Sequence, residues 1–286
     1  MQVDVTNRLG ALTPATPTGF PTLDAWTLGG LRNGTMAVLS GPPGAGKSSF
    51  LLLLAYMAAR ARGAVVFVSA ALDETEVFAR LAARALYRDY PDSATSYGAI
   101  WSGEAWQDDF TRNAVGTSVN VAIRKVGQLF HLFKAKPFDT TLEISAAASH
   151  LWGRHERVLL FIDGVEALGA SVAGDTARAA TINSDFSSRL TQVGYELRHL
   201  AEGGCAVVVT AARDNAQWLM PSATVAAELI PARRALESLS HRDRVLGAQG
   251  VDLVVTKNHV GPSGTIAMKF IAGGAVIEEE VRPGTT

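Results

Sequence analysis

The chain of 286 residues contains one cysteine, Cys205, which excludes an internal disulfide and a cysteine-ligated zinc cluster. Cys205 lies in an apolar run, so we expect a buried, unreactive thiol rather than a nucleophile. No apolar run reaches the about 18 residues that a membrane span needs. The N-terminus also lacks a basic-then-apolar signal segment. The sequence therefore predicts a cytoplasmic protein with no membrane partner.

An excess of charge of either sign is also absent. The formal net charge is −1 and the isoelectric point is near 6.6, so no overall basic field attracts nucleic acid and any such contact must be local. Internal repeats, low-complexity tracts and interdomain linkers are likewise not evident. We therefore predict one domain over residues 16–280, with an N-terminal arm at 1–15 and a tail at 281–286.

A glycine-rich run fits the phosphate-binding pattern G-x-x-x-x-G-K-[ST] at every fixed position. Its residues, with the serine that follows, are Gly41, Pro42, Pro43, Gly44, Ala45, Gly46, Lys47, Ser48 and Ser49. The pattern predicts that backbone N–H groups surround the phosphates of ATP, that Lys47 reaches the β- and γ-phosphates, and that Ser48 holds Mg²⁺. A glycine-rich turn that matches by chance is the alternative. An apolar segment before the run and a helical pattern after it favour nucleotide binding.

Continuous apolar segments alternate with helical patterns along the chain. The expected strands are 35–40, 64–69, 157–163 and 204–210, and the expected helices are 48–61, 74–88, 140–153 and 181–202. Strands that are apolar throughout are typical of a parallel sheet covered on both faces. Three further segments, 251–257, 265–270 and 275–277, are separated by tight turns and predict antiparallel strands. The fold class is therefore α/β, a mostly parallel sheet flanked by helices with an antiparallel C-terminal extension.

The third expected strand ends in an acid, Asp163. Ligands of open α/β sheets bind at the carboxyl ends of the strands, where this carboxylate would orient Mg²⁺. The alternative is a strand-ending aspartate that forms a turn with Gly164. Beside an intact phosphate-binding loop, the metal role is favoured.

Over about residues 16–277 the chain resembles the RecA-like core of DnaB-type replicative helicases. Short matches occur in the family's order, and they are 18–31, the phosphate-binding loop, 69–80, 142–144, 188–201 and the run 256–265. That last run is similar to the family signature K-x-R-x-G-P-x-G. The resemblance implies a RecA-like P-loop ATPase that binds Mg-ATP between subunits and acts on single-stranded DNA.

Three positions depart from the family pattern. Ala71 stands where the family has the glutamate that polarises the attacking water. Ala211 replaces a glutamine that senses the γ-phosphate, and His259 replaces the arginine that one subunit inserts into its neighbour's ATP site. Lys257, the lysine that accompanies that arginine in the K-x-R signature, is retained. A neutral histidine supplies no fixed bidentate charge. Because the binding groups are kept and these three groups are lost, we expect nucleotide binding in the micromolar range with slow or absent hydrolysis.

Other residues offer substitutes for the missing groups. Glu74 and Glu166 are candidate catalytic bases, although the position of Glu74 is also explained by a helix start in which Asp73 and Glu76 cap each other. The candidate replacement charges are Arg213, Arg233 and Arg234.

Two classes of function remain open. The first is an ATP-dependent helicase or DNA-remodelling protein, and the second is a regulatory or scaffold protein that binds ATP without fast hydrolysis. Either would act as a homo-oligomer or with a separate partner subunit. Loops near 169–181 and 213–246 are the candidate contacts with single-stranded DNA, and a mixed-charge solvated face is the alternative for the second. For 97–136 we expect helix and hairpin packing at the sheet edge, with no chemistry assigned.

Overall fold

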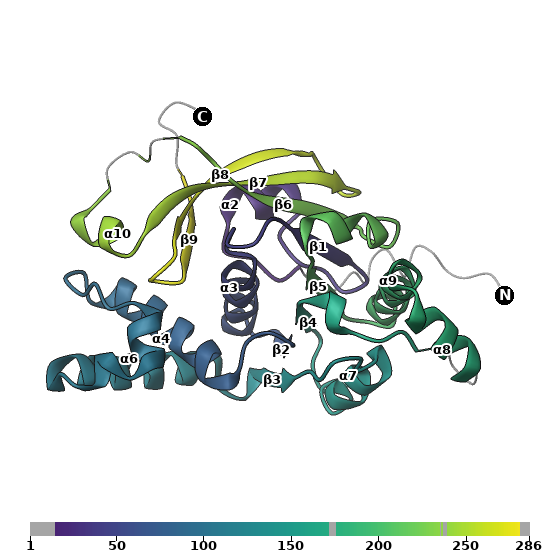
Figure 1. Cartoon of the computed structure of the whole chain (residues 1–286), viewed down its shortest axis with the longest axis horizontal. Helices are drawn as coiled ribbons and strands as arrows, with labels where there is room; N and C mark the ends of the chain where they lie inside the picture. The colour runs from purple at the N-terminus through teal and green to yellow at the C-terminus, as the bar shows by residue number, and fades with distance from the viewer. Residues whose placement is uncertain (1–14, 172–175, 235, 237–238, 281–286) are drawn as a thin grey trace.

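The computed structural model describes residues 15–171, 176–234, 236 and 239–280. One sheet of nine strands crosses this part of the chain in the order β3-β2-β4-β5-β1-β6-β7-β8-β9 (Figure 1). The strands are β1 Met36–Ser40, β2 Ala64–Ser69, β3 Phe130–Lys134, β4 Val158–Asp163, β5 Ala206–Thr210, β6 Val225–Pro231, β7 Ala248–Asn258, β8 Gly264–Ile271 and β9 Val276–Glu279. The neighbours in β3-β2-β4-β5-β1-β6 pair parallel, and the neighbours in β6-β7-β8-β9 pair antiparallel. The predicted fold class is confirmed. The predicted tail, and the predicted arm apart from Ala15, lie outside the described residues.

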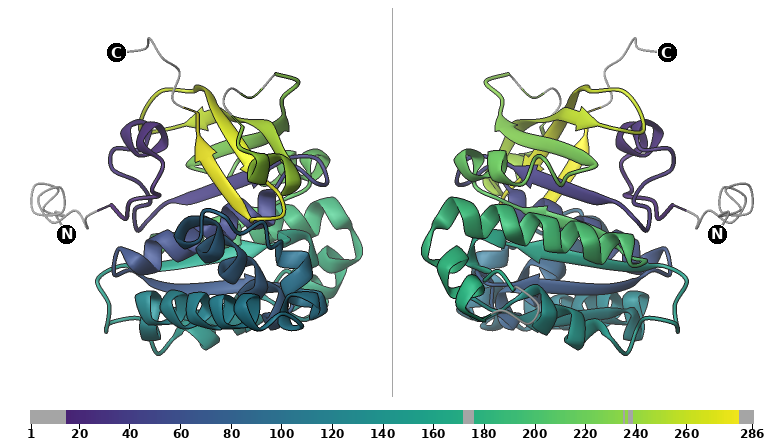
Figure 2. Two further views of the ribbon diagram at one scale, coloured as in Figure 1. Left: turned by 90° about the vertical axis from the view of Figure 1, so that its left-hand side faces the viewer. Right: turned by 90° about the vertical axis from the view of Figure 1, so that its right-hand side faces the viewer.

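Helices cover both faces of the parallel part of the sheet (Figures 1 and 2). The α-helices are α2 Pro21–Trp26, α3 Lys47–Arg60, α4 Glu74–Asp89, α5 Tyr97–Ser102, α6 Asp109–Val126, α7 Thr141–Ala148, α8 Thr176–Ser184, α9 Phe186–Glu202 and α10 His241–Val245. Four short 3₁₀ helices are η1 Glu104–Trp106, η2 Gly127–Leu129, η3 Val165–Ala167 and η4 Arg213–Trp218. Helices α3 and α6 pack on one face, and α7 and α9 on the other.

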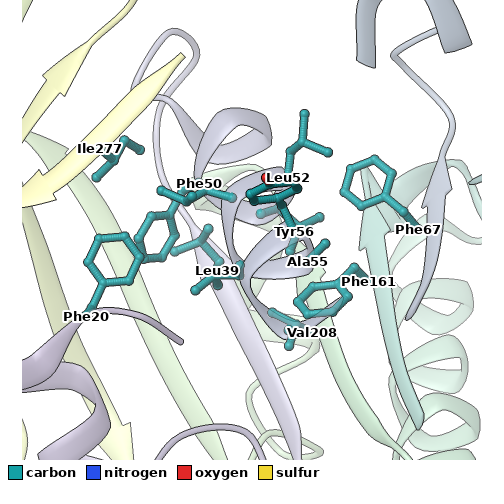
Figure 3. Packing of buried hydrophobic residues seen from close by; sticks show 14 of the residues in the cluster. Phe20, Leu39, Phe50, Leu52, Ala55, Tyr56, Phe67, Phe161, Val208 and Ile277 are labelled. Carbon is teal, nitrogen blue, oxygen red and sulfur yellow. The ribbon is translucent and has the colours of Figure 1, made fainter. Parts of the chain in front are cut away.

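The parallel strands are apolar on both faces because each face has its own core. Along β2, Val65 and Phe67 join the core under α3, whereas Val66 and Val68 join the core under α9. Helix α3 is itself packed between the parallel strands and the antiparallel extension, as the side chains in Figure 3 show. This double packing explains why α3 is apolar nearly all round and not amphipathic.

Two strands were not predicted, and each has a physical reason. Strand β3 pairs parallel with β2 at the edge of the sheet, and its sequence Phe-His-Leu-Phe-Lys is only half-buried. The hairpin expected within 97–136 is therefore wrong, because this region forms α5, α6 and a single parallel strand. Strand β6 lies within the expected loop 213–246, and its polar Glu228 pairs with Arg213.

Two expected helices differ in the structure: one ends early and the other is divided in two. The expected helix 140–153 stops after Ala148, and the expected helix 181–202 is two helices. Asp185 causes the break, because its carboxylate accepts a hydrogen bond from the Ser188 backbone N–H at 2.7 Å and so caps a new helix. Of the expected loop 169–181, residues 172–175 lie outside the described residues.

The expected burial of the one cysteine is confirmed. Cys205 is 1% exposed, and burial raises the pKa of its thiol to about 12. None of the described helices combines the length and apolar character that crossing a membrane requires.

Candidate nucleotide-binding site

The phosphate-binding loop connects β1 to α3 at the carboxyl edge of the sheet. Two of its glycines are required by their surroundings. Gly41 has φ 152°, and a Cβ there would lie 2.5 Å from the Leu229 carbonyl oxygen. Gly46 caps α3 in a left-handed conformation with φ 92°, and a Cβ would lie 3.0 Å from the Phe270 ring. The antiparallel strand β8 thus supports the loop from behind, and larger residues would displace it.

Lys47 begins α3 and crosses the loop. Its Nζ donates hydrogen bonds to the carbonyl oxygens of Gly41 at 2.8 Å and Pro42 at 3.0 Å. Burial lowers the pKa of this ammonium, and the charges of Glu166 and Asp163 oppose that shift. The positive charge of Lys47 therefore lies within the electrostatic range of two carboxylates at the same edge of the sheet.

Asp163, at the end of β4, is 3% exposed. Its Oδ1 accepts hydrogen bonds from Ser48 Oγ at 3.0 Å and Thr210 Oγ1 at 2.8 Å. Its Oδ2 is buried and has no partner among the described residues. Burial raises the pKa of this carboxyl group, and the two hydroxyl hydrogen bonds and the charges of Arg80 and Lys47 oppose the shift. The structure thus holds a carboxylate with one unsatisfied oxygen beside the loop.

Thr210 positions this carboxylate, and sequence reasoning missed it. Its Oγ1 donates to Asp163 and accepts from the Gly164 backbone N–H at 2.8 Å. The neighbouring residues Ile162 and Val209 pair in register, so the ends of β4 and β5 meet here. A hydroxyl residue at the end of the next apolar strand was the available signal.

The residues present fit a magnesium ion. Mg²⁺ takes oxygen ligands, and the free Oδ2 of Asp163 and the hydroxyl of Ser48 supply oxygen atoms next to each other. One oxygen of the buried carboxylate lacks a hydrogen-bond partner among the described residues, which is the arrangement a cation would complete. Bound Mg²⁺ would neutralise phosphate charge there.

The two candidate catalytic carboxylates have different surroundings. Glu166 lies in η3 directly after β4, and its Oε1 accepts hydrogen bonds from the Ala212 backbone N–H and from Asn215 Nδ2. Glu74 is exposed at the start of α4. The charge of Glu166 opposes the lowering of the Lys47 pKa more strongly than that of Asp163 does. The structure thus brings Glu166 and not Glu74 into the electrostatic range of the loop lysine.

Helix α4 contacts the start of α3 through Arg80. Arg80 donates to Ser49 Oγ at 2.9 Å and forms an ion pair with Glu76 at 2.8 Å. Asp73 caps α4 by accepting from the Glu76 backbone N–H at 2.7 Å, which confirms the predicted cap. The expected reciprocal bond is absent from the described residues, because the Glu76 carboxylate bonds Arg80.

Comparison with protein families identifies one match. The sequence model of the DnaB-like helicase C-terminal domain matches residues 15–210, which is more than half of the chain. The chain belongs to this family. The run 257–264 lies beyond the matched residues. A sequence search of curated proteins finds no match.

Solved structures share the fold over nearly the whole chain. One of them, an ATPase domain, matches with a TM-score of 0.72 and 18% identity, covering 97% of this chain and 96% of that one. A DnaB-like replicative helicase, solved with regard to its interactions with primase, matches with a TM-score of 0.72 and 18% identity. The alignment covers 95% of this chain but 63% of that helicase, so the chain spans less than two thirds of its length.

The departures from the DnaB-type pattern fall in different environments. Ala71 is exposed after β2, where a longer side chain has room. Ala211 is 1% exposed and belongs to the core under α9, with Ala216 and Leu219. His259 is exposed beyond the end of β7. Position 211 has therefore become part of the hydrophobic core, whereas positions 71 and 259 remain at the surface.

His259 lies toward the end of β1 opposite the loop, and Lys257 bonds a carbonyl oxygen outside the loop. The His259 backbone N–H donates a hydrogen bond to the Thr224 carbonyl oxygen. The Thr224 backbone N–H in turn donates to the carbonyl oxygen of Met36, the first residue of β1. The loop leaves the other end of β1, about 13 Å away along the strand. Lys257 Nζ bonds the Met220 carbonyl oxygen at 2.7 Å. The hydrogen bonds printed for these two residues thus lead to Thr224 and Met220 and not to the loop.

The three candidate replacement arginines differ in availability. Arg213 forms an ion pair with Glu228, and Arg234 forms ion pairs with Asp252 and Glu280. Arg233 is exposed. Of the three, Arg233 is the one whose guanidinium group is not already committed to a carboxylate among the described residues.

Proposed function

We propose that this DnaB-family domain binds Mg-ATP at the loop 41–48 and works as an ATPase module of the helicase type. The observation that carries the proposal is the buried Oδ2 of Asp163, which lacks a partner among the described residues and lies in the carboxylate that Ser48 also bonds. Lys47 would pair with the phosphates, and the N-terminus of α3 would direct its dipole at them.

A second function rests on the lost groups. At position 211 the γ-phosphate sensor is replaced by a core alanine, and at position 71 the glutamate is replaced by an exposed alanine. Groups that bind the ground state are kept, whereas groups that act in the transition state are not. The alternative is therefore a regulatory or scaffold protein that uses bound ATP as a structural switch and hydrolyses it slowly. In either case Glu166 is the best-placed remaining base.

The partners are proposals as well. Because Lys257 and His259 lie away from their own loop, a nucleotide site completed by a second copy fits the geometry, and a separate partner subunit is the alternative. Single-stranded DNA is proposed as the substrate of the helicase function. The primase interaction belongs to the solved relative and is not carried over to this chain.

The test is ATP binding and steady-state hydrolysis by the purified chain, with and without single-stranded DNA, beside a Lys47→Ala variant. We expect ATP binding in the micromolar range that the variant loses, and turnover well below that of a working helicase. DNA-stimulated, Lys47-dependent turnover would favour the motor over the switch. Equal ATP binding by both proteins would contradict the proposed site.

A further inference from the structure

Arginines of α3 and α4 meet at one tyrosine ring, toward the end of α3 that lies away from the phosphate-binding loop. Arg84 of α4 lies over the ring of Tyr56, with its guanidinium carbon 5.2 Å from the ring centroid. Arg60, at the end of α3, approaches the same ring at 6.0 Å. Tyr56 is 4% exposed and faces the core in Figure 3. One buried ring thus gathers two guanidinium groups from two helices.

Arg88 extends this cluster. It follows Arg84 by one turn of α4, a spacing that places both side chains on the same face of the helix. Like charges at this spacing repel each other. Arg80, one turn earlier, is different because its two terminal nitrogens already bond Ser49 and Glu76. Three arginines, Arg60, Arg84 and Arg88, therefore form what we call the arginine cluster.

The cluster has little compensating negative charge. Among the described residues, no group accepts a hydrogen bond from, or forms an ion pair with, the side chain of any of its three members. Burial lowers the pKa of Arg84 to about 10, with a further lowering from Arg88 and Arg60. The acid that acts on it is Glu278 of β9, which is shared with Lys269 at 3.3 Å. Folding has thus gathered three like charges that no hydrogen-bonded carboxylate among the described residues balances, which costs stability unless an anion binds there.

We propose that the arginine cluster is a binding site for a phosphate-bearing ligand. The planar guanidinium group donates two parallel hydrogen bonds to one phosphate, and Arg60 and Arg88 are exposed and free to do so. Arg84 adds a charge whose orientation is fixed by the Tyr56 ring. The ligand's phosphates come either from a nucleic-acid backbone or from a small polyphosphate.

The first test measures binding of inorganic pyrophosphate by calorimetry in a Lys47→Ala background, which removes the contribution of the loop lysine. Arg60→Gln with Arg88→Gln should weaken binding at least about tenfold. The matched control is Arg124→Gln with Lys125→Gln, two exposed cations of α6, and it should change affinity less than about twofold. Absence of binding in the parent, or equal weakening by both pairs, overturns the proposal.

A second variant separates binding from folding. Arg84→Met removes a half-buried charge that no carboxylate among the described residues bonds, so its melting temperature without phosphate should equal or exceed that of the parent. The rise in melting temperature that pyrophosphate produces in the parent should disappear. A variant that keeps this rise contradicts the site, whatever its own stability.

The source of the phosphate is identified by competition. An oligonucleotide of about 20 unpaired residues that displaces pyrophosphate, with an affinity that falls steeply with salt, identifies a nucleic-acid backbone. If it does not compete and pyrophosphate still binds, the ligand is a small polyphosphate. An oligonucleotide that binds without any dependence on Arg60 and Arg88 uses another surface.

Discussion

The two halves of the proposed nucleotide site differ in what they retain. In the phosphate-binding half, Ser48 bonds Asp163, and the charge of Asp163 acts on Lys47. The hydrolytic half has alanine at positions 71 and 211 and histidine at position 259. The fold is preserved in both halves, so it does not depend on the catalytic groups. Binding of a substrate and stabilisation of its transition state are separable properties of the same scaffold.

The largest effect is expected from restoring the two exposed positions of the hydrolytic half. Ala71→Glu combined with His259→Arg should raise ATP turnover about 100-fold, because a carboxylate to polarise water and a fixed positive charge return. Steady-state phosphate release measures this. The matched control is Ala71→Gln with His259→Arg, which has the same volume at position 71 without the charge. If both double variants turn over equally slowly, the missing glutamate is not what limits hydrolysis.

Restoring the third position should fail for a structural reason. Ala211 is 1% exposed in the core under α9, so Ala211→Gln forces an amide among apolar side chains. We expect the free energy of unfolding to fall by about 2–3 kcal/mol, measured by chemical denaturation. Ala212→Gln, one residue later and exposed, is the control and should be near neutral. An unchanged stability of Ala211→Gln would show that this core accommodates the sensor residue.

A smaller effect should distinguish the two remaining acids. Glu166→Gln removes a negative charge that acts on the loop lysine while keeping an oxygen for the Ala212 N–H, so residual turnover should fall about tenfold. Glu74→Gln, at an exposed position, should leave turnover unchanged. Single-turnover kinetics of both variants gives the comparison. A loss in the Glu74 variant alone would return the catalytic role to α4.

The parts of the fold that the sequence predicted are those with two-sided burial. Strands β1, β2, β4 and β5 are covered on both faces, so an unbroken apolar run marks each one. Strand β3 lies at the sheet edge and carries His131 and Lys134, and β6 contains two alanines and Glu228. Their place depends on neighbours that are distant in sequence, which no local pattern records.

The candidate site divides in a similar way. Lys47, Ser48 and Asp163 were predictable because a loop pattern and a strand end fix their positions locally. Thr210 and Asn215 were not, since their roles depend on the pairing of β4 with β5 and on the turn that follows. The arginine cluster was also missed, because it forms between helices α3 and α4 and matches no short motif.

The smallest predicted effect concerns Asp163, the buried carboxylate that should affect both Mg²⁺ binding and stability. Because burial raises the pKa of Asp163 in the fold, the folded state prefers the protonated acid, and stability is lost as the pH rises through the folded pKa. Asp163→Asn should therefore raise the free energy of unfolding by about 1 kcal/mol at neutral pH. This gain should shrink as the pH is lowered toward about 4, the ordinary pKa of aspartate.

The same substitution should reduce Mg²⁺-dependent ATP binding, because the amide lacks the negative charge that holds the cation. Denaturation at several pH values, together with titration of ATP with and without Mg²⁺, measures both consequences in one variant. Ser171→Ala, outside the site, provides a reference for an unrelated polar change. A variant that is less stable at neutral pH and binds Mg-ATP normally would mean that Asp163 is a structural turn residue. A variant that is more stable but no longer needs Mg²⁺ for ATP binding would instead show that Asp163 lowers stability and is kept because it binds the cation.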